Sequence, residues 1–235
     1  MRLPARSVLG SIVAVAAALV AASGALACSG YSYAGVGASP GAFGIRAAIT
    51  PLPAFAVKSG QVAGWVGVGG PGTGPAGSDE WLQVGWSGFP EVSGAALYYE
   101  LRLPNEPPSY HELAAARPYG GTAHVEVLEL RGRRDYWRVW VDGSPASAAI
   151  HLPASHGRLP AIATAESFDA GGACNGFLFR FRDVSVARSP GGSWTPLSSG
   201  YPIASSGTRV VRASAGSFIA GRGADAVTLL TSLGP

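Results

Sequence analysis

Four histidines are the first candidates for acid-base or metal chemistry in this chain. No two of them lie four residues apart on a helical pattern, the spacing that places two imidazoles on one metal ion. His151 and His156 are close in sequence, but Pro153 and Gly157 favour a turn at this point. We therefore expect no metal site, and nothing else in the sequence calls for a cofactor.

Two short motifs match known catalytic patterns only in part. Residues 67–72 satisfy Gly-x-Gly-x-x-Gly, but Gly and Pro continue through Pro75, where a dinucleotide site needs a helix to begin. Residues 85–88 fall one residue short of the Gly-x-Ser-x-Gly turn that carries the nucleophile of many serine hydrolases. We expect a loop at the first motif and no serine nucleophile at the second.

The closest carboxylate pair within a predicted strand is Glu126 and Glu129. Side chains alternate between the two faces of a strand, so this odd spacing sends them to opposite sides. A glycosidase needs two carboxyl groups facing each other across about 5–10 Å. The pair therefore argues against that reaction.

Alternation places a different polar group on one sheet face. Leu82, Val84 and Trp86 form an apolar set at alternate positions, which turns Trp81 and Gln83 to the opposite side. Gln83 should thus lie on a sheet face that does not belong to the core.

The next predicted strand, 95–103, has the same pattern. Its apolar positions leave Tyr98, Glu100 and Arg102 pointing away from the core. Together the two strands predict a mixed polar and aromatic surface that could hold an extended peptide.

These strands belong to an all-β chain. Runs of alternating residues separated by Gly, Pro, Ser and Asp clusters favour an antiparallel β-sandwich. The expected strands are 44–50, 61–68, 80–86, 95–103, 122–130, 135–142, 146–152, 161–168, 177–182, 208–213 and 224–231. The one helix signal is the capping box Ser109-x-x-Glu112, which predicts a short helix over 111–117 that ends at Pro118.

The N-terminus predicts a secretory signal peptide over 1–27. Arg2 and Arg6 precede a long uncharged apolar run, and small residues occupy the cleavage positions before residue 28. We expect residues 28–235 to form one sandwich domain outside the cytoplasm, with no second apolar run long enough to span a membrane.

Composition limits the partners of this domain. Removing 1–27 takes away two of the 17 Lys and Arg and none of the 14 Asp and Glu, so the net charge falls from +3 to +1. The densest basic cluster is 131–134, which is too small for a nucleic-acid surface. We expect a monomer that binds no nucleic acid.

The chain has two cysteines, Cys28 and Cys174. A disulfide between them would close a long loop and contribute about 4 kcal/mol in an oxidising compartment. The alternative is a lipid anchor on Cys28, although Ala25 and Leu26 stand in the wrong order for a typical lipobox.

A set of short segments in a fixed order is more specific than any of these motifs. The segments are Ser29-Gly30-Tyr31, Ile49-Thr50-Pro51-Leu52-Pro53, Gly64-Trp65-Val66-Gly67-Val68-Gly69, Leu82-Gln83-Val84-Gly85, Tyr98-Tyr99-Glu100-Leu101-Arg102-Leu103-Pro104, Thr164-Ala165-Glu166 and Phe181-Arg182-Asp183-Val184. Over 29–188 the chain resembles the glutamic peptidases, or eqolisins, and 189–235 would be a C-terminal extension that adds strands at the edge of the sandwich.

The resemblance implies a concanavalin-like sandwich and a secreted hydrolase that cleaves proteins at acidic pH without metal or cofactor. It assigns catalysis to Gln83 and Glu166 and makes Trp65 a cleft residue. On the same face, Trp81, Tyr98 and Glu100 would contact the substrate. Glu166 would move the proton, and Gln83 would donate a hydrogen bond to the oxyanion.

The chain departs from the family pattern at three positions. Gly69 stands where the family has Asp, Ser167 replaces the Trp of Ala-Glu-Trp, and Cys28 replaces a Trp before Ser-Gly-Tyr. These changes leave a second interpretation open, an inactive sandwich that binds glycan or peptide at the cell envelope on the aromatic rings of Trp65, Trp81 and Tyr98.

Overall fold

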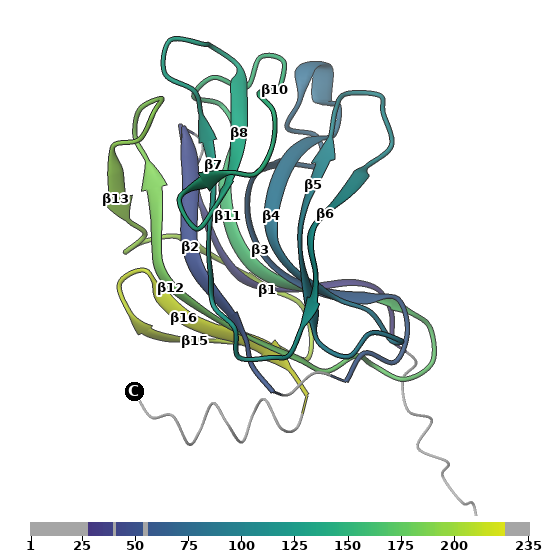
Figure 1. Ribbon diagram of the computed structural model, residues 1–235. Helices are drawn as coiled ribbons and strands as arrows, with labels where there is room; N and C mark the ends of the chain where they lie inside the picture. Colours follow the sequence, from purple (N-terminus) through teal and green to yellow (C-terminus); the bar gives the residue numbers. More distant parts are fainter. Residues whose placement is uncertain (1–27, 40, 54–55, 224–235) are drawn as a thin grey trace, which may run out of the picture.

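The computed structural model describes residues 28–39, 41–53 and 56–223. In this part of the chain, two antiparallel sheets pack face to face (Figure 1). The first has the order β14-β1-β11-β3-β4-β5-β6, and the second has the order β10-β8-β7-β2-β12-β16-β15, with β13 beside β12 and β9 beside β8. The predicted antiparallel sandwich is thus confirmed.

Most of the predicted strands are confirmed to within a few residues, whereas β1, β6, β9, β13, β14 and β16 were not among the expected strands. The first sheet contains β1 (Ser29–Ala38), β3 (Gln61–Gly70), β4 (Glu80–Gly88), β5 (Ala95–Arg102), β6 (Ser109–Arg117), β11 (Ala161–Ala170) and β14 (Tyr201–Ala204). The second contains β2 (Gly44–Pro51), β7 (Ala123–Glu129), β8 (Tyr136–Val141), β9 (Ser144–Pro145), β10 (Ile150–His151), β12 (Phe177–Ala187), β13 (Trp194–Pro196), β15 (Thr208–Ser214) and β16 (Ser217–Arg222). A single 3₁₀ turn, Pro75–Gly77, follows β3 among the described residues.

The core lies between the sheets and is built from alternate residues of each strand. Leu82, Val84 and Trp86 of β4 are buried there, as their spacing predicts. The indole Nε1 of Trp86 donates a hydrogen bond of 3.1 Å to the carbonyl oxygen of Ile49 in the opposite sheet. Each buried side chain of this size contributes about 1.5–3 kcal/mol, so this alternation also fixes which residues face outward.

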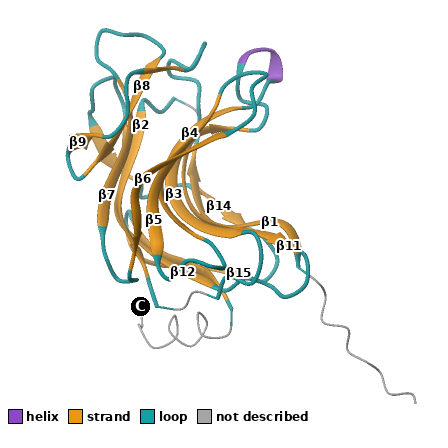
Figure 2. Cartoon of the chain, turned by 45° about the vertical axis from the view of Figure 1, so that its right-hand side comes forward, coloured by secondary structure: helices purple, strands orange, loops and turns teal. Residues whose placement is uncertain are grey.

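The first sheet is bent along its strands, and the face turned away from the second sheet is concave (Figure 2). On this face, large side chains stand opposite glycines of the neighbouring strand. Trp65 pairs with Gly85, and Gln83 pairs with Gly67. A Cβ atom at Gly67 would lie 2.8 Å from the Cβ atom of Gln83, so only glycine leaves room for that side chain.

Residues 109–117 form strand β6, and the predicted helix over 111–117 is wrong. A helix of two turns is marginal by itself, because few of its backbone groups are paired. The edge of β5 offers a ladder of hydrogen bonds instead, and the ring of His111 stacks on that of Tyr99 with centroids 4.4 Å apart. Pairing with β5 therefore overrides the capping-box pattern.

The C-terminal segment adds strands to both sheets. Strand β14 lies beside β1 at one edge of the first sheet, and β16 and β15 extend the second sheet from β12. Of the predicted strand 146–152, only Ile150–His151 pairs with β8. The predicted signal peptide 1–27 and the predicted strand 224–231 lie outside the described residues.

Cys28 and Cys174 form a disulfide, as predicted, which ties the start of β1 to the loop between β11 and β12. The same region holds a buried ion pair in which Nη2 of Arg222 lies 2.7 Å from each carboxylate oxygen of Asp169. In this oxidised form Cys28 has no free thiol to carry a lipid.

Replacing both cysteines by serine is expected to lower the free energy of unfolding by about 4 kcal/mol, because the bond closes a loop between residues 146 positions apart. Thermal unfolding of the double variant measures this, and the reduced wild-type protein should unfold at the same lower temperature. A melting temperature equal to that of the oxidised protein would show that the bond contributes no stability.

Glu80 is a buried carboxyl group whose two oxygens have no hydrogen-bond partner. Burial, aided by the nearby negative charge of Asp135, raises its pKa from 4.5 to about 7. The folded protein therefore holds this proton more tightly than the unfolded chain. The resulting stability is complete below about pH 4.5 and is lost as the pH rises through 7.

Glu80→Gln is expected to remove this loss. Relative to the wild type, the variant should gain about 3 kcal/mol of unfolding free energy between pH 4 and pH 8, the equivalent of the pKa rise from 4.5 to about 7. Denaturant unfolding at both pH values measures the difference, with the exposed Glu91→Gln as control. An equal effect at both pH values would contradict the prediction.

Candidate active site

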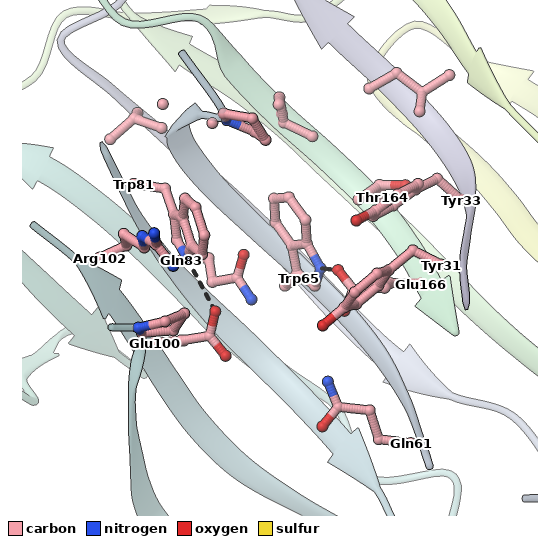
Figure 3. Close-up of a pocket in the computed structure, with 17 residues that line it drawn as sticks. Tyr31, Tyr33, Gln61, Trp65, Trp81, Gln83, Glu100, Arg102, Thr164 and Glu166 are labelled. Carbon is pink, nitrogen blue, oxygen red and sulfur yellow. Dashed lines mark hydrogen bonds between the residues drawn. The ribbon is translucent and has the colours of Figure 1, made fainter. Parts of the chain in front are cut away.

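A cavity of about 700 Å³ lies on the concave face of the first sheet. Its walls come from six strands, β1, β3, β4, β5, β11 and β14, and from the loops after β3 and β5 (Figure 3). The lining residues include Tyr31, Tyr33, Gln61, Trp65, Trp81, Gln83, Glu100, Arg102, Ile162, Thr164 and Glu166. Both residues of the expected Glu/Gln pair thus line the same cavity.

Glu166 is 6% exposed and points from β11 into this cavity. Its Oε2 accepts a hydrogen bond of 2.9 Å from Nε1 of Trp65 on the neighbouring strand. Burial, and to a smaller extent the charge of Glu100, raise the pKa of the carboxyl group, while hydrogen bonds from Trp65 and Gln61 lower it, and the net result is a pKa of about 7. Glu166 is therefore a carboxyl group that can both hold and release a proton near neutral pH.

Gln83 projects from β4 on the other side of Trp65 (Figure 3). Its Nε2 donates a hydrogen bond of 3.1 Å to the hydroxyl oxygen of Tyr98, which fixes the orientation of the amide. An NH₂ group has two hydrogens, so one remains to donate to an oxygen atom in the cavity.

Tyr98 does not lie on an open surface, so its expected role in contacting the substrate is corrected. The side chain is 2% exposed, and its ring stacks on that of Tyr110 with centroids 5.1 Å apart. Strand β6, which carries Tyr110, covers the edge of β5 and closes over Tyr98. Tyr98 therefore orients the amide of Gln83 and does not face the cavity itself.

Trp81, Glu100 and Arg102 form the end of the cavity next to Gln83. Nε1 of Trp81 donates a hydrogen bond of 2.9 Å to Oε1 of Glu100, and the guanidinium carbon of Arg102 lies 5.4 Å from the centre of the Trp81 ring. Burial raises the pKa of Glu100, while the bond from Trp81 lowers it. All three residues were expected on this surface, Trp81 and Glu100 as contacts of the substrate.

The opposite end carries aromatic rings that the alternation did not single out. Tyr31 is 58% exposed and stacks on Tyr33 with centroids 6.1 Å apart. Gln61, the other residue missed, shares a face with Trp65 because the two are four positions apart in one strand. Counting every second residue from Trp65 toward the N-terminus of the strand would have identified Gln61.

The departures from the family pattern have structural explanations. Gly69 has φ +88°, and a Cβ atom there would collide with the backbone oxygen of Glu80, so this backbone admits no Asp. Ser167 is fully buried and accepts a hydrogen bond of 3.1 Å from Nδ2 of Asn175, on the side away from Glu166. The change at Ser167 therefore removes nothing from the cavity.

The remaining candidates of the sequence lie elsewhere. Glu129 is buried and accepts hydrogen bonds of 2.9 Å and 3.1 Å from Nδ1 of His156. Glu126, three residues earlier in β7, lies opposite Arg46 of β2. The loop expected at residues 67–72 is only partly present, because 67–70 pair within β3 and the turn begins at Pro71. No group of three His, Cys, Asp or Glu suited to a metal occurs within the described ranges, and no helix there is long and apolar enough to cross a membrane.

Comparison with known proteins gives a match at the level of structure only. No family profile and no curated sequence matches the chain. Solved structures with this fold include scytalido-glutamic peptidase with a peptide-based transition-state analogue (TM-score 0.59, 17% identity) and with a transition-state analogue inhibitor (0.56, 14%). A third is SCP-B, a member of the eqolisin family, with the tripeptide Ala-Ile-His (0.54, 15%). Each match covers 84% of this chain and 100% of the other. The chain therefore has the fold of the glutamic peptidases.

Proposed function

We propose that this protein hydrolyses peptide bonds at acidic pH through Glu166 and Gln83. The observation that carries the proposal is the pairing of a buried carboxyl group, with a pKa of about 7, and an oriented amide in one cavity. The fold supports it, because the solved structures that share it are peptidases, one with a peptide-based transition-state analogue and one with the tripeptide Ala-Ile-His.

The two groups suit the two demands of peptide hydrolysis. The ionised carboxylate of Glu166 takes a proton from a water molecule as the water oxygen attacks the peptide carbonyl carbon. Gln83 donates its free N–H to the carbonyl oxygen, which becomes negative as the new C–O bond forms. Glu166 then returns the proton to the nitrogen as the C–N bond breaks, which releases an amine and a carboxylic acid.

Two effects set the expected pH dependence. Below pH 7 the ionised fraction of Glu166 falls about tenfold per pH unit, so activity declines toward strong acid. From about pH 4.5 to 7 the fold loses stability, because the buried Glu80 and Glu166, whose pKa values are raised to about 7, still hold protons that the unfolded chain has released. Activity should therefore rise through the mildly acidic range and be greatest between about pH 6 and 7.

The proposal includes the setting in which the protein acts. A signal peptide over 1–27 would direct residues 28–235 out of the cytoplasm as one monomeric domain. The disulfide between Cys28 and Cys174 fits an oxidising compartment. The substrate would be a protein or peptide in an extended conformation that fits the cavity.

The second candidate function is binding without catalysis. The exposed ring of Tyr31, stacked on the half-buried ring of Tyr33, would suit a glycan or a peptide together with Trp81 at the other end. In that case Glu166 would serve as a hydrogen-bonding group only.

Glu166→Gln is expected to lower kcat at least about 10²-fold, because the amide cannot exchange a proton, and Gln83→Ala about 10²-fold through loss of the oxyanion donor. Cleavage of an unfolded protein by purified residues 28–235 measures both between pH 3 and 8. Glu126→Gln, a strand glutamate of the second sheet, should retain full activity.

Full activity of folded Glu166→Gln would overturn the dyad. A folded wild-type protein that cleaves nothing at any pH but binds peptide or glycan would favour the second candidate.

Trp65→Phe is expected to raise the pKa of Glu166 by up to about one unit, because the carboxylate loses a donor that stabilises its charged form. The acid limb of kcat/KM should move to higher pH by the same amount. Trp81→Phe removes a hydrogen-bond donor from Glu100 instead, so it should not move the acid limb of kcat/KM to higher pH. An unchanged limb in Trp65→Phe would show that Glu166 does not control activity in acid.

A further inference from the structure

Arg102 carries the only cationic side chain among the described residues that line the cavity. It lies at the end next to Gln83, in a row formed by Gly69, Trp81 and Arg102 on three paired strands. The next row contains Gly67, Gln83 and Glu100. Two positions along a strand span about 7 Å, so Arg102 is one or two residues of an extended peptide away from the oxyanion donor.

The guanidinium is held in place but is not saturated. Its Nη2 lies 3.4 Å from Oδ2 of Asp79, and its plane is supported by the ring of Trp81. Its Nε is buried and has no hydrogen-bond partner. A planar group with five donors therefore retains a donor with no acceptor within the protein.

The surroundings add little negative charge at this end of the cavity. Glu166, with a pKa of about 7, is largely protonated in mild acid. Burial also raises the pKa of Glu100, whose Oε1 already accepts a hydrogen bond from Trp81. Gly69, where the family has Asp, has no side chain and no room for one. Asp79 is the remaining carboxylate, and its Oδ1 already accepts a hydrogen bond of 3.0 Å from the backbone of Gly72.

We propose that Trp81 and Arg102 form a subsite that binds a carboxylate group of the substrate peptide. The inference rests on the proposed function and specifies its substrates: peptides with an acidic side chain, or a free C-terminal carboxylate, near the bond to be cleaved. Arg102 donates to the carboxylate, and Trp81 packs against the carbon atoms that carry it. A lysine at the same position would meet a like charge and bind poorly.

The test uses full-length mature protein carrying Glu166→Gln, so that peptides bind without turnover. Fluorescence anisotropy at about pH 5.5 compares peptides in which Glu, Gln or Lys is scanned through each position, with free and with amidated C-termini. We expect a peptide with Glu at one position to bind about tenfold more tightly than its Gln counterpart. If the carboxylate comes from the C-terminus instead, amidation should remove the preference.

Matched variants then assign the preference to Arg102. Arg102→Met should abolish it, Arg102→Lys should keep part of it, and Asp79→Asn should keep or increase it by freeing the guanidinium. Equal binding of Glu, Gln and amidated peptides, or a preference that survives Arg102→Met, would overturn the subsite.

The same peptides separate this proposal from the proposed function. Cleavage by the wild-type protein with no preference for carboxylates would reject the subsite and keep the peptidase. A carboxylate preference in a protein that cleaves nothing would keep the subsite and reject the peptidase.

Discussion

The concave site depends on the alternation of side chains along strands whose other faces form the core. Leu82 and Val84 are fixed by packing against the second sheet, so Trp81 and Gln83 have no other direction in which to point. Glycine across from each large residue lets the side chain lie over its neighbour's backbone. The packing of the core therefore orients the side chains of the site. A substitution that loosens the core would disturb the site even if every cavity residue were kept.

The same physical cost, a carboxyl group deprived of water, appears twice with different consequences. At Glu166 it is partly offset by Trp65 and Gln61, and the result is a group that exchanges protons near neutral pH. At Glu80 no partner offsets it, and the result is a fold that loses stability as the pH rises from about 4.5 through 7. Chemistry and stability thus depend on pH over the same range.

Much of this could be read from the sequence because strand alternation is a local property. The apolar positions of β4 predicted that Gln83 points away from the core, and those of β5 predicted the same for Glu100. Long-range pairing was less accessible. Strand β6 replaced a predicted helix because the edge of β5 was available, and its arrival buried Tyr98. Strand β1, rich in Gly, Ser and Ala, has a low strand propensity and forms because β11 pairs with it.

The position of β1 also sets the order in which the molecule can be assembled. Its Tyr33 lies opposite Glu166, and its other edge pairs with β14 near residue 202, so the first strand of the fold has no partner until most of the chain exists. Contacts this distant in sequence form slowly and late. The wall that carries Tyr31 and Glu166 is then among the last parts to close, and a nascent chain has no completed cavity with which to act on itself or its neighbours.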